Sequence, residues 1–300
     1  MKKINLTKNF NISGIVHGHW RLAEWNLSNQ ELLKLVEQTI ELGITSFDHA
    51  DIYGDYSCEE LFGNALRLNR DLRKNIQIIT KCGIKLKSHK HPERKIKYYD
   101  YSFNHIVNSV NSSLKNFGTD YIDLLLLHRP APFFDPEEVA KAFSYLKENG
   151  KVLHFGVSNF NPVQFDMLNS YLDEKLVTNQ VEISPYCLEH FENGNLDYLI
   201  KEKIKPMAWS PLAGGQLINP TDTKGKRLKK ILSEIAVELN IKNVDQIAIS
   251  WLLKHPARII PVVGTGKIER IKNAVEAMEI KLNPEQWYKI YNASTGNELP

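Results

Sequence analysis

The chain has 300 residues, of which 42% are hydrophobic and 24% charged, and its formal net charge at pH 7 is +3. This length can bury the core of one α/β barrel or of two ordinary domains. The small, interspersed charge argues against a nucleic-acid-binding protein, which would carry a concentrated basic face.

The chain also lacks the signals of secreted and membrane proteins. No apolar run approaches the ~18 residues of a membrane span. The N-terminal segment MKKINLTKNFNISG has no apolar stretch after its basic start, so it is not expected to be a signal peptide. The three cysteines, Cys58, Cys82 and Cys187, are widely spaced without a CxxC pair, which argues against disulfides and a structural zinc site. We therefore expect a cytoplasmic protein with no membrane partner and no metal.

Eight short apolar runs alternate with helical patterns along the chain. Several are too continuously apolar to have one face in water, which is typical of a parallel sheet covered on its outer side. The expected strands are Gly14–His17, Ile44–Phe47, Ile76–Lys81, Tyr121–Leu127, Val152–Val157, Val177–Gln180, Lys205–Trp209 and Ile259–Val263. With no composition break that marks a linker, these alternations predict a (β/α)8 TIM barrel as a single domain over residues 1–300.

The helices between these strands have readable ends. Ser28 and Glu31 form a capping box, and Gly43 ends the helix that follows. Further starts are indicated by a cap residue before proline at Asp135–Pro136 and Asn161–Pro162, and one helical apolar face spans His105–Leu114. The two longer loops, Ile84–Tyr101 and Pro211–Gly225, are expected to be functional or mobile.

Polar side chains follow three consecutive apolar strands. The segment FDHADIYG supplies Asp48, Asp51 and Tyr53, the segment ITKCG supplies Lys81, and LLLLHRP supplies His128. Each alone has a plainer interpretation as a turn former, a packed aromatic, a surface lysine or a rim histidine. Because the reactive groups of a TIM barrel come from the carboxyl ends of its strands, we expect these side chains to meet at one rim.

Such a group is suited to proton delivery. A lysine ammonium would lower the pKa of a phenol from its usual value of about 10, and an aspartate would keep that lysine charged. A histidine can orient a carbonyl by donating a hydrogen bond. The set offers no nucleophile with an adjacent base and no metal-ligand spacing, but it fits protonation of an oxygen on which negative charge builds.

These residues resemble the catalytic residues of the aldo-keto reductases. FDHADIYG is similar to the strand-two signature of that family, and Asp48, Tyr53, Lys81 and His128 fill its four catalytic positions. GKVLHFGVSNF (150–160) is similar to its strand-five signature, and the resemblance runs from about Gly14 to Trp287. Within the family, DHADIYG, AWS and GTGKIER are most similar to bacterial predicted oxidoreductases. The resemblance implies NADPH-dependent reduction of an aldehyde or ketone, with Tyr53 as the proton donor, His128 as the group that positions the carbonyl oxygen, and Lys81 with Asp48 tuning the phenol.

The resemblance also implies an NADP(H) site without a Rossmann fold, and the first strand is indeed not followed by GxGxxG. Ser158, Asn159 and Gln180 would hydrogen-bond the nicotinamide carboxamide, and Trp209 would stack on the ring and so orient it. The remaining expected cofactor residues are Gly18, Trp20, Arg21 and Asp48, the pyrophosphate residues Ser210, Pro211, Leu212 and Gly214, and the helix-opening residues Gly264, Thr265 and Gly266.

Specificity for NADPH over NADH is expected from Lys267 and Arg270, which occupy the positions that hold the 2′-phosphate. Without that context, both would be interpreted as an exposed helix face. Asn273 and Ala274 replace a Glu–Asn pair that often contacts adenine in the family, which implies looser adenine binding.

The substrate is expected to be a small carbonyl compound bound by Tyr53, His128 and Trp20. Trp25, Tyr56 and Arg129 are further candidates for the substrate mouth, and aromatic walls would suit apolar carbonyls, although core packing explains the tryptophans equally well. Two other functions stay open: a nucleotide-binding, redox-sensing regulatory subunit with little turnover, and a Schiff-base aldolase that uses Lys81. Cys82 would add thiol sensitivity only if it were not a buried, inert cysteine. We expect a monomer or a weak homo-oligomer.

Overall fold

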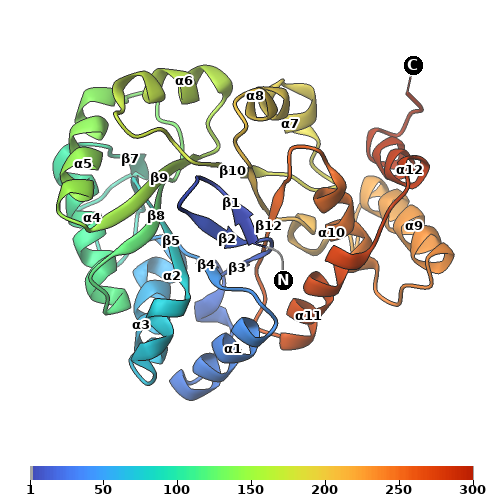
Figure 1. Cartoon of the computed structure of the whole chain (residues 1–300), viewed down its shortest axis with the longest axis horizontal. Coiled ribbons are helices and arrows are strands. Elements are labelled where there is room, and N and C mark those ends of the chain that lie inside the picture. Colours follow the sequence, from blue (N-terminus) through green and yellow to red (C-terminus); the bar gives the residue numbers. More distant parts are fainter. Residues whose placement is uncertain (1–2, 300) are drawn as a thin grey trace.

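Eight parallel strands close into a barrel in which strands that follow one another along the chain are paired in space (Figure 1). The computed structural model describes residues 3–299, so the first two residues of the N-terminal segment considered above lie outside the described residues. The barrel strands are β3 (Val16–Gly18), β4 (Ser46–Asp48), β5 (Gln77–Cys82), β8 (Ile122–Leu127), β9 (Val152–Ser158), β10 (Asn179–Glu182), β11 (Met207–Trp209) and β12 (Ile260–Val263). β12 pairs with β3 and closes the barrel. The predicted TIM barrel is confirmed, and all eight carboxyl ends lie at one rim.

Helices cover the outside of the barrel (Figure 1). They are α1 (Asn29–Glu41), α2 (Tyr53–Tyr56), α3 (Cys58–Leu66), α4 (Phe103–Phe117), α5 (Pro136–Glu148), α6 (Pro162–Tyr171), α7 (Glu189–Glu192), α8 (Asn195–Lys201), α9 (Thr223–Glu238), α10 (Val244–Lys254), α11 (Ile268–Glu276) and α12 (Pro284–Thr295). The capping box of Ser28 and Glu31 is formed, and Asp135 and Asn161 cap α5 and α6 as predicted. α4 begins two residues before the predicted apolar face, because the Ser102 side chain caps it.

Four barrel strands, β3, β4, β10 and β11, begin two residues later than their apolar runs suggested. Ile44 and Val177 are buried, but each precedes the first paired residue of β4 or β10. An apolar run records burial of side chains, whereas a strand is defined by pairing of its backbone. The two properties therefore need not start at the same residue.

An N-terminal hairpin was not predicted. β1 (Lys3–Asn5) and β2 (Asn11–Ser13) pair antiparallel and lie across the centre of the barrel in Figure 1. Leu6, Phe10 and Ile12 of this hairpin pack with apolar residues from the barrel strands. The hairpin therefore closes the end of the barrel opposite the carboxyl rim.

The two long loops contain some regular structure. In the segment 84–101, β6 (Ile84–Lys85) pairs antiparallel with β7 (Tyr98–Tyr99). In the other loop α9 starts at Thr223, inside the expected range, because Asp222 accepts a hydrogen bond from the backbone of Gly225 at 2.7 Å. Both loops are therefore partly ordered by local hydrogen bonds.

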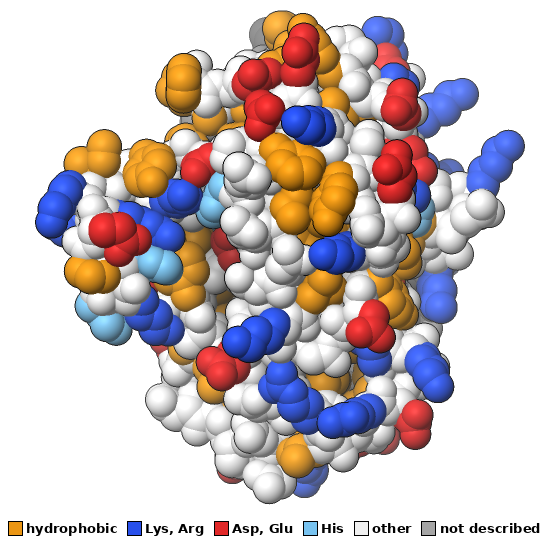
Figure 2. Space-filling view, turned by 90° about the vertical axis from the view of Figure 1, so that its left-hand side faces the viewer, with side chains coloured by type: hydrophobic (Ala, Val, Ile, Leu, Met, Phe, Trp, Pro, Cys, Tyr) orange, Lys and Arg blue, Asp and Glu red, His pale blue; other side chains and the backbone are white. Residues whose placement is uncertain are grey.

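The outer surface carries charges of both signs. Figure 2 shows one face, on which Lys, Arg, Asp and Glu side chains are interspersed with apolar ones. Among residues 3–299, every helix is too short or too polar to serve as a membrane span.

Candidate active site

The four predicted catalytic side chains meet at the carboxyl rim. Asp48 is the last residue of β4, Lys81 lies in β5, His128 follows β8 directly, and Tyr53 begins α2. Lys81 Nζ donates to both carboxylate oxygens of Asp48, at 2.8 and 2.7 Å, and lies 3.2 Å from the Tyr53 hydroxyl. The rings of Tyr53 and His128 pack edge to face with centroids 5.8 Å apart. Three neighbouring strands thus bring an acid, a lysine, a phenol and an imidazole together.

The charge on Lys81 is held by its surroundings. Both partners of its ion pair with Asp48 are almost fully buried, at 1% and 4% side-chain exposure. Burial alone would lower the pKa of Lys81, but the negative charge of Asp48 and the contact with Tyr53 raise it above its ordinary value. Lys81 is therefore an ammonium group, and its nitrogen has no free lone pair for attack on a carbonyl carbon.

Asp48 has a second partner that the sequence did not reveal. The side-chain nitrogen of Gln180, expected at the cofactor, donates to Asp48 Oδ1 at 2.8 Å. Because an unpaired buried polar group is costly, the hydrogen bonds from Gln180 and Lys81 stabilise the buried Asp48 side chain. Gln180 follows Asp48 by 132 residues, and only closure of the barrel brings the two together.

The prediction of a lowered pKa for Tyr53 was wrong, because the net shift is upward. Burial raises the pKa of Tyr53, and the positive charge of Lys81 lowers it only in part. The charge of Asp48 adds to the rise. The phenol is therefore fully protonated near neutral pH, which is the state required of a proton donor.

His128 is neutral. Burial lowers its pKa well below the ordinary value, and the positive charges of Lys81 and Arg129 act in the same direction. Its buried Nδ1 has no hydrogen-bond partner within the described part of the chain. A neutral imidazole carries one N–H, so His128 can donate a single hydrogen bond to a carbonyl oxygen.

Asp51 and Cys82 adjoin Lys81. Burial, reinforced by the charge of Glu59, raises the pKa of Asp51 to about 8, and Asp51 accepts a hydrogen bond from Ser109 at 2.8 Å. Burial also raises the pKa of the Cys82 thiol well above its usual range. A disfavoured thiolate is unreactive, so Cys82 has the properties of an inert buried cysteine.

The residues expected around a nicotinamide form one connected group. Ser158 ends β9 and Asn159 follows it, while Trp209 ends β11. The Asn159 amide donates to Ser158 Oγ at 2.8 Å and accepts from the Trp209 indole at 3.0 Å. The left-handed backbone of Asn159 (φ 63°) turns its side chain into this group. Together with Gln180, these side chains offer both donors and acceptors beside Asp48, as a carboxamide requires.

The residues expected around the cofactor phosphates lie on more open backbone. Ser210 and Gly214 adopt left-handed φ values of 50° and 62°, and a side chain at Gly214 would meet no described atom within 4 Å. Pro211 is buried and Leu212 half-buried in the same turn. This turn therefore leaves its backbone accessible beside the end of β11.

The start of α11 is suited to an anion. The N-cap residue of α11, Lys267, makes no side-chain capping hydrogen bond within the described chain. The amides of the first turn therefore lack an intrahelical partner. Thr265 is buried and its hydroxyl accepts from the Lys267 amide at 3.2 Å, while Lys267 and Arg270 are exposed. Gly264 and Gly266 flank Thr265, with Gly264 exposed. Free amides and two cations are the donor set that a phosphate group prefers.

Gly18 brings the first strand close to this turn. A side chain on Gly18 would lie 2.9 Å from Val262 and 3.7 Å from the Cα of Gly264. Trp20 is 57% exposed, and the Arg21 guanidinium lies 5.2 Å from the centre of its ring. Gly18 is therefore required for close packing, whereas Trp20 and Arg21 are available to a ligand.

A column of three histidines was missed by the sequence reasoning. The rings of His17 and His19 lie 4.4 Å apart, His19 stacks on His49 at 4.4 Å, and all three are fully buried. His17 bonds to the backbone oxygen of Thr265 at 2.9 Å, and the backbone oxygen of His49 accepts from Lys81 at 2.8 Å. Burial lowers the pKa of His17 to about 4 and those of the other two well below normal. The i, i+2 spacing of HGH, which places two side chains on one side of a strand, was the available signal.

The expected substrate-mouth residues occupy different places. Arg129 lies with its guanidinium 5.4 Å from the centre of the Trp209 ring, beside His128. Tyr56 has its hydroxyl held by Arg94 at 2.7 Å. Trp25 instead stacks on His17 and contacts Gly266, so it belongs to the packing beneath the α11 turn.

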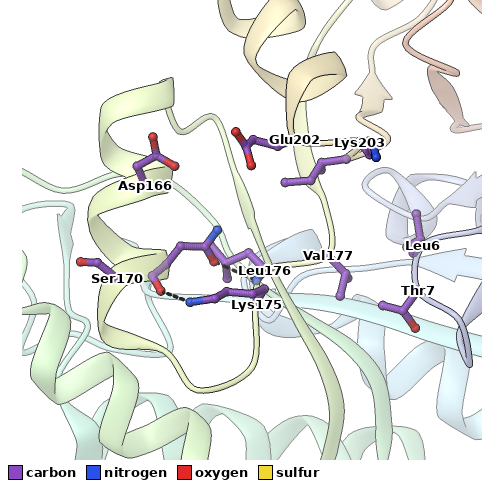
Figure 3. A pocket seen from close by; sticks show the side chains of 11 residues that line it. Leu6, Thr7, Asp166, Ser170, Lys175, Leu176, Val177, Glu202 and Lys203 are labelled. Atoms are coloured by element: carbon purple, nitrogen blue, oxygen red, sulfur yellow. Dashed lines mark hydrogen bonds between the residues drawn. The ribbon is translucent and has the colours of Figure 1, made fainter.

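The structure also contains a groove far from these residues. A cavity of about 570 Å³ lies at the opposite end of the barrel, where Leu6 and Thr7 of the hairpin face the segments that precede β10 and β11 (Figure 3). Its Lys175 side chain donates to the backbone oxygen of Asn169 at 2.9 Å. Catalytic groups of TIM barrels lie at the carboxyl rim, so size alone does not make this groove the active site.

Known proteins resemble this chain along its whole length. A model of the aldo/keto reductase family matches residues 14–294. The uncharacterized oxidoreductase YcsN of Bacillus subtilis (strain 168) is 50% identical over 300 residues, which cover 100% of both chains. A 6-dehydroglucose reductase of Agrobacterium fabrum is 40% identical, again over 100% of both chains. A crystal structure of the thermostable aldo-keto reductase Tm1743 with the inhibitor epalrestat has a TM-score of 0.82 and 26% identity, covering 98% of this chain and 100% of that one.

Proposed function

The chain belongs to the aldo/keto reductase family of oxidoreductases, and we propose that it reduces aldehydes or ketones to alcohols with NADPH, using Tyr53 as the proton donor. One observation carries this proposal. The Lys81 ammonium lies within hydrogen-bond distance of both Asp48 carboxylate oxygens and of the Tyr53 hydroxyl, next to a neutral His128. This arrangement fits acid catalysis at a carbonyl oxygen.

Each of these residues has a separate role in the proposed reaction. His128 donates its N–H to the carbonyl oxygen and holds that oxygen near the Tyr53 hydroxyl. Tyr53 transfers its proton as negative charge builds on the oxygen, and the Lys81 ammonium stabilises the phenolate that remains. Asp48 keeps Lys81 charged and aimed. When bound, NADPH supplies the hydride for the carbonyl carbon.

The same reasoning supports the cofactor assignment. Ser158, Asn159 and Gln180 would hold the carboxamide, and Trp209 would stack on the nicotinamide ring. Lys267 and Arg270 would bind the 2′-phosphate at the start of α11, where backbone amides add to their charge. Their side chains give the chain a means of distinguishing NADPH from NADH.

We further propose an oxygen-rich aldehyde of the sugar type as substrate, in place of the apolar carbonyls suggested by the tryptophans. The relative from Agrobacterium fabrum is named a 6-dehydroglucose reductase. The mouth beside His128 carries the cations Arg129 and Lys97, whose charges both act on that histidine. Arg129 offers a fork of hydrogen-bond donors to the hydroxyl groups of a sugar.

The alternatives are supported less well. The aldolase mechanism needs an uncharged lysine, and Asp48 raises the pKa of Lys81. A redox-sensing subunit would retain the nucleotide and turn over very slowly. The complete set of four catalytic residues favours an enzyme that turns over.

The test is oxidation of NADPH, followed by nicotinamide absorbance, with a polyhydroxylated aldehyde and an alkyl aldehyde of equal chain length. We expect a higher kcat/KM for the polyhydroxylated substrate. Arg129→Met should reduce this preference by about tenfold, the effect of one lost charge-assisted hydrogen bond. The control is Arg258→Met, because Arg258 is exposed just before β12 at the other end of the barrel. A preference for the alkyl aldehyde would overturn the substrate class, and tight nucleotide retention without turnover would favour the sensor.

A further inference from the structure

The segment 84–101 contacts residues on both sides of the active site. It leaves β5 through Gly83 and returns through β7, and its two ends are joined by an ion pair between Lys85 and Asp100 at 2.8 Å. The Asp100 amide also donates to the Gly83 oxygen at 2.9 Å. The reaction described above gives this segment no role.

At one end of the segment, Tyr101 holds the residue that follows His128. The buried Tyr101 hydroxyl donates to the Arg129 backbone oxygen at 2.5 Å and accepts from the Arg129 amide at 3.0 Å. Its ring fills the space over Gly83, where a Cβ would lie 1.9 Å from a ring carbon. Because both backbone groups of Arg129 bond to one rigid phenol, the path of the chain after His128 is fixed by Tyr101.

Within the segment, other groups hold the turn that follows Tyr53. Gly54, Asp55 and Tyr56 have left-handed φ values of 57°, 52° and 65°. Asp55 and Tyr56 are not glycine, so this conformation is unfavourable and persists only where neighbours maintain it.

The neighbours that maintain this turn come from the same segment. The Tyr56 hydroxyl accepts from the Leu86 amide at 2.9 Å and from the Arg94 guanidinium at 2.7 Å. The imidazole of His89 lies 3.1 Å from the Asp55 carboxylate. These contacts fix the turn whose first residue is Tyr53.

We propose that the segment 84–101 positions both hydrogen-bond donors of the active site, His128 through Tyr101 and Tyr53 through Arg94 and Tyr56. Tyr101 and Arg94 are thus positioning residues, because each acts through backbone or through another side chain. Displacing a donor by about 1 Å can lower a rate by about 10²-fold. Loss of either clamp should therefore lower kcat, whereas NADPH binding on the β9–β12 side should not change. This inference rests on the proposed function.

The first variant is Tyr101→Phe, which removes the hydroxyl and keeps the ring over Gly83. We expect kcat to fall by about tenfold or more, with the Kd of NADPH, from fluorescence titration, within about twofold of the wild type. Tyr99→Phe is the matched control, because the Tyr99 hydroxyl has no hydrogen-bond partner among residues 3–299. A kcat of Tyr101→Phe equal to that of Tyr99→Phe would overturn the role of Tyr101.

The second pair of variants addresses Tyr53. Arg94→Met removes the side-chain donor to the Tyr56 hydroxyl and leaves the Leu86 amide, whereas Arg94→Lys keeps a side-chain donor. We expect Arg94→Met to lower kcat by about tenfold and Arg94→Lys to restore most of it. Equal losses of kcat in Arg94→Met and Arg94→Lys would contradict the proposed role of the hydrogen bond from Arg94 to Tyr56. This pair also keeps the test open if Tyr101→Phe fails to fold.

Hydrogen exchange provides a readout that does not depend on turnover. In Tyr101→Phe the Arg129 amide should exchange at least about tenfold faster than in the wild type, because its acceptor is gone. In Arg94→Met the amides of residues 54–57 should exchange faster. Unchanged exchange in both variants would overturn the inference. Faster exchange in the variants, together with a wild-type protein that does not reduce carbonyls, would refute only the proposed function.

Discussion

The β4–β5 side and the α11 side of the rim, which we propose hold the catalytic and the phosphate-binding groups, place their charged side chains in opposite ways. On the β4–β5 side, the buried Asp48 carboxylate and Lys81 ammonium satisfy each other within the protein. On the α11 side, Lys267 and Arg270 are exposed, and neither forms an ion pair within residues 3–299. A buried charge requires a partner within the protein, whereas an exposed cation is solvated and costs little free energy when no ligand is bound. The first region should therefore couple function to stability, and the second should couple function only to ligand binding.

The largest effect is expected on the buried side. Lys81→Met leaves Asp48 buried without its counter-charge, so we expect about 3–5 kcal/mol less stability and a fall in kcat of about 10²–10⁴. Denaturant unfolding and NADPH oxidation measure the two effects. Lys267→Met is the matched control and should unfold like the wild type. Equal unfolding of both variants would remove the contrast between the two regions.

The histidine column lies between the two regions and should make stability depend on pH. The unfolded chain protonates His17 near its ordinary pKa of 6.5, whereas the folded chain does so only near 4. Between these values the unfolded state binds more protons, so stability falls as the pH falls. His17→Gln removes this term, and its stability relative to the wild type should increase by about 3 kcal/mol between pH 7 and pH 4.

Urea unfolding of both proteins over that pH range measures the difference and cancels the carboxylate contributions that they share. A constant difference would show that His17 titrates normally in the folded protein.

The smallest effect is expected on the exposed side. Arg270→Ala removes one charge-assisted contact, so the Kd of NADPH should rise about tenfold or more, and that of NADH by less than about twofold. Unfolding should change by less than about 0.5 kcal/mol. Fluorescence titration with the two nucleotides measures the change. Equal losses for NADPH and NADH would refute the 2′-phosphate assignment, and a large loss of stability would contradict the comparison.

Much of this rim could be predicted because the relevant signals are local. Asp48, Lys81 and His128 lie at or just after the ends of apolar runs, and a parallel barrel brings such ends together. The helix caps at Ser28 and Asn161 are likewise set by neighbours within three residues.

The features that were missed depend on long-range packing. The Gln180–Asp48 bond and the column of buried histidines exist only once the barrel closes. The direction of the pKa shift of Tyr53 could not be predicted, because a motif shows the charge of Lys81 but not the extent of burial. The N-terminal hairpin is short, and its core contacts come from strands far along the chain.

The most direct test of the proposed reaction is Tyr53→Phe, which removes the acid and keeps the ring. Single-turnover oxidation of NADPH by an aldehyde should slow by about 10²–10⁴, because no other phenol lies within reach of Lys81 in the described structure. The Kd of NADPH should stay within about twofold of the wild type. A single-turnover rate near that of the wild type would contradict the account.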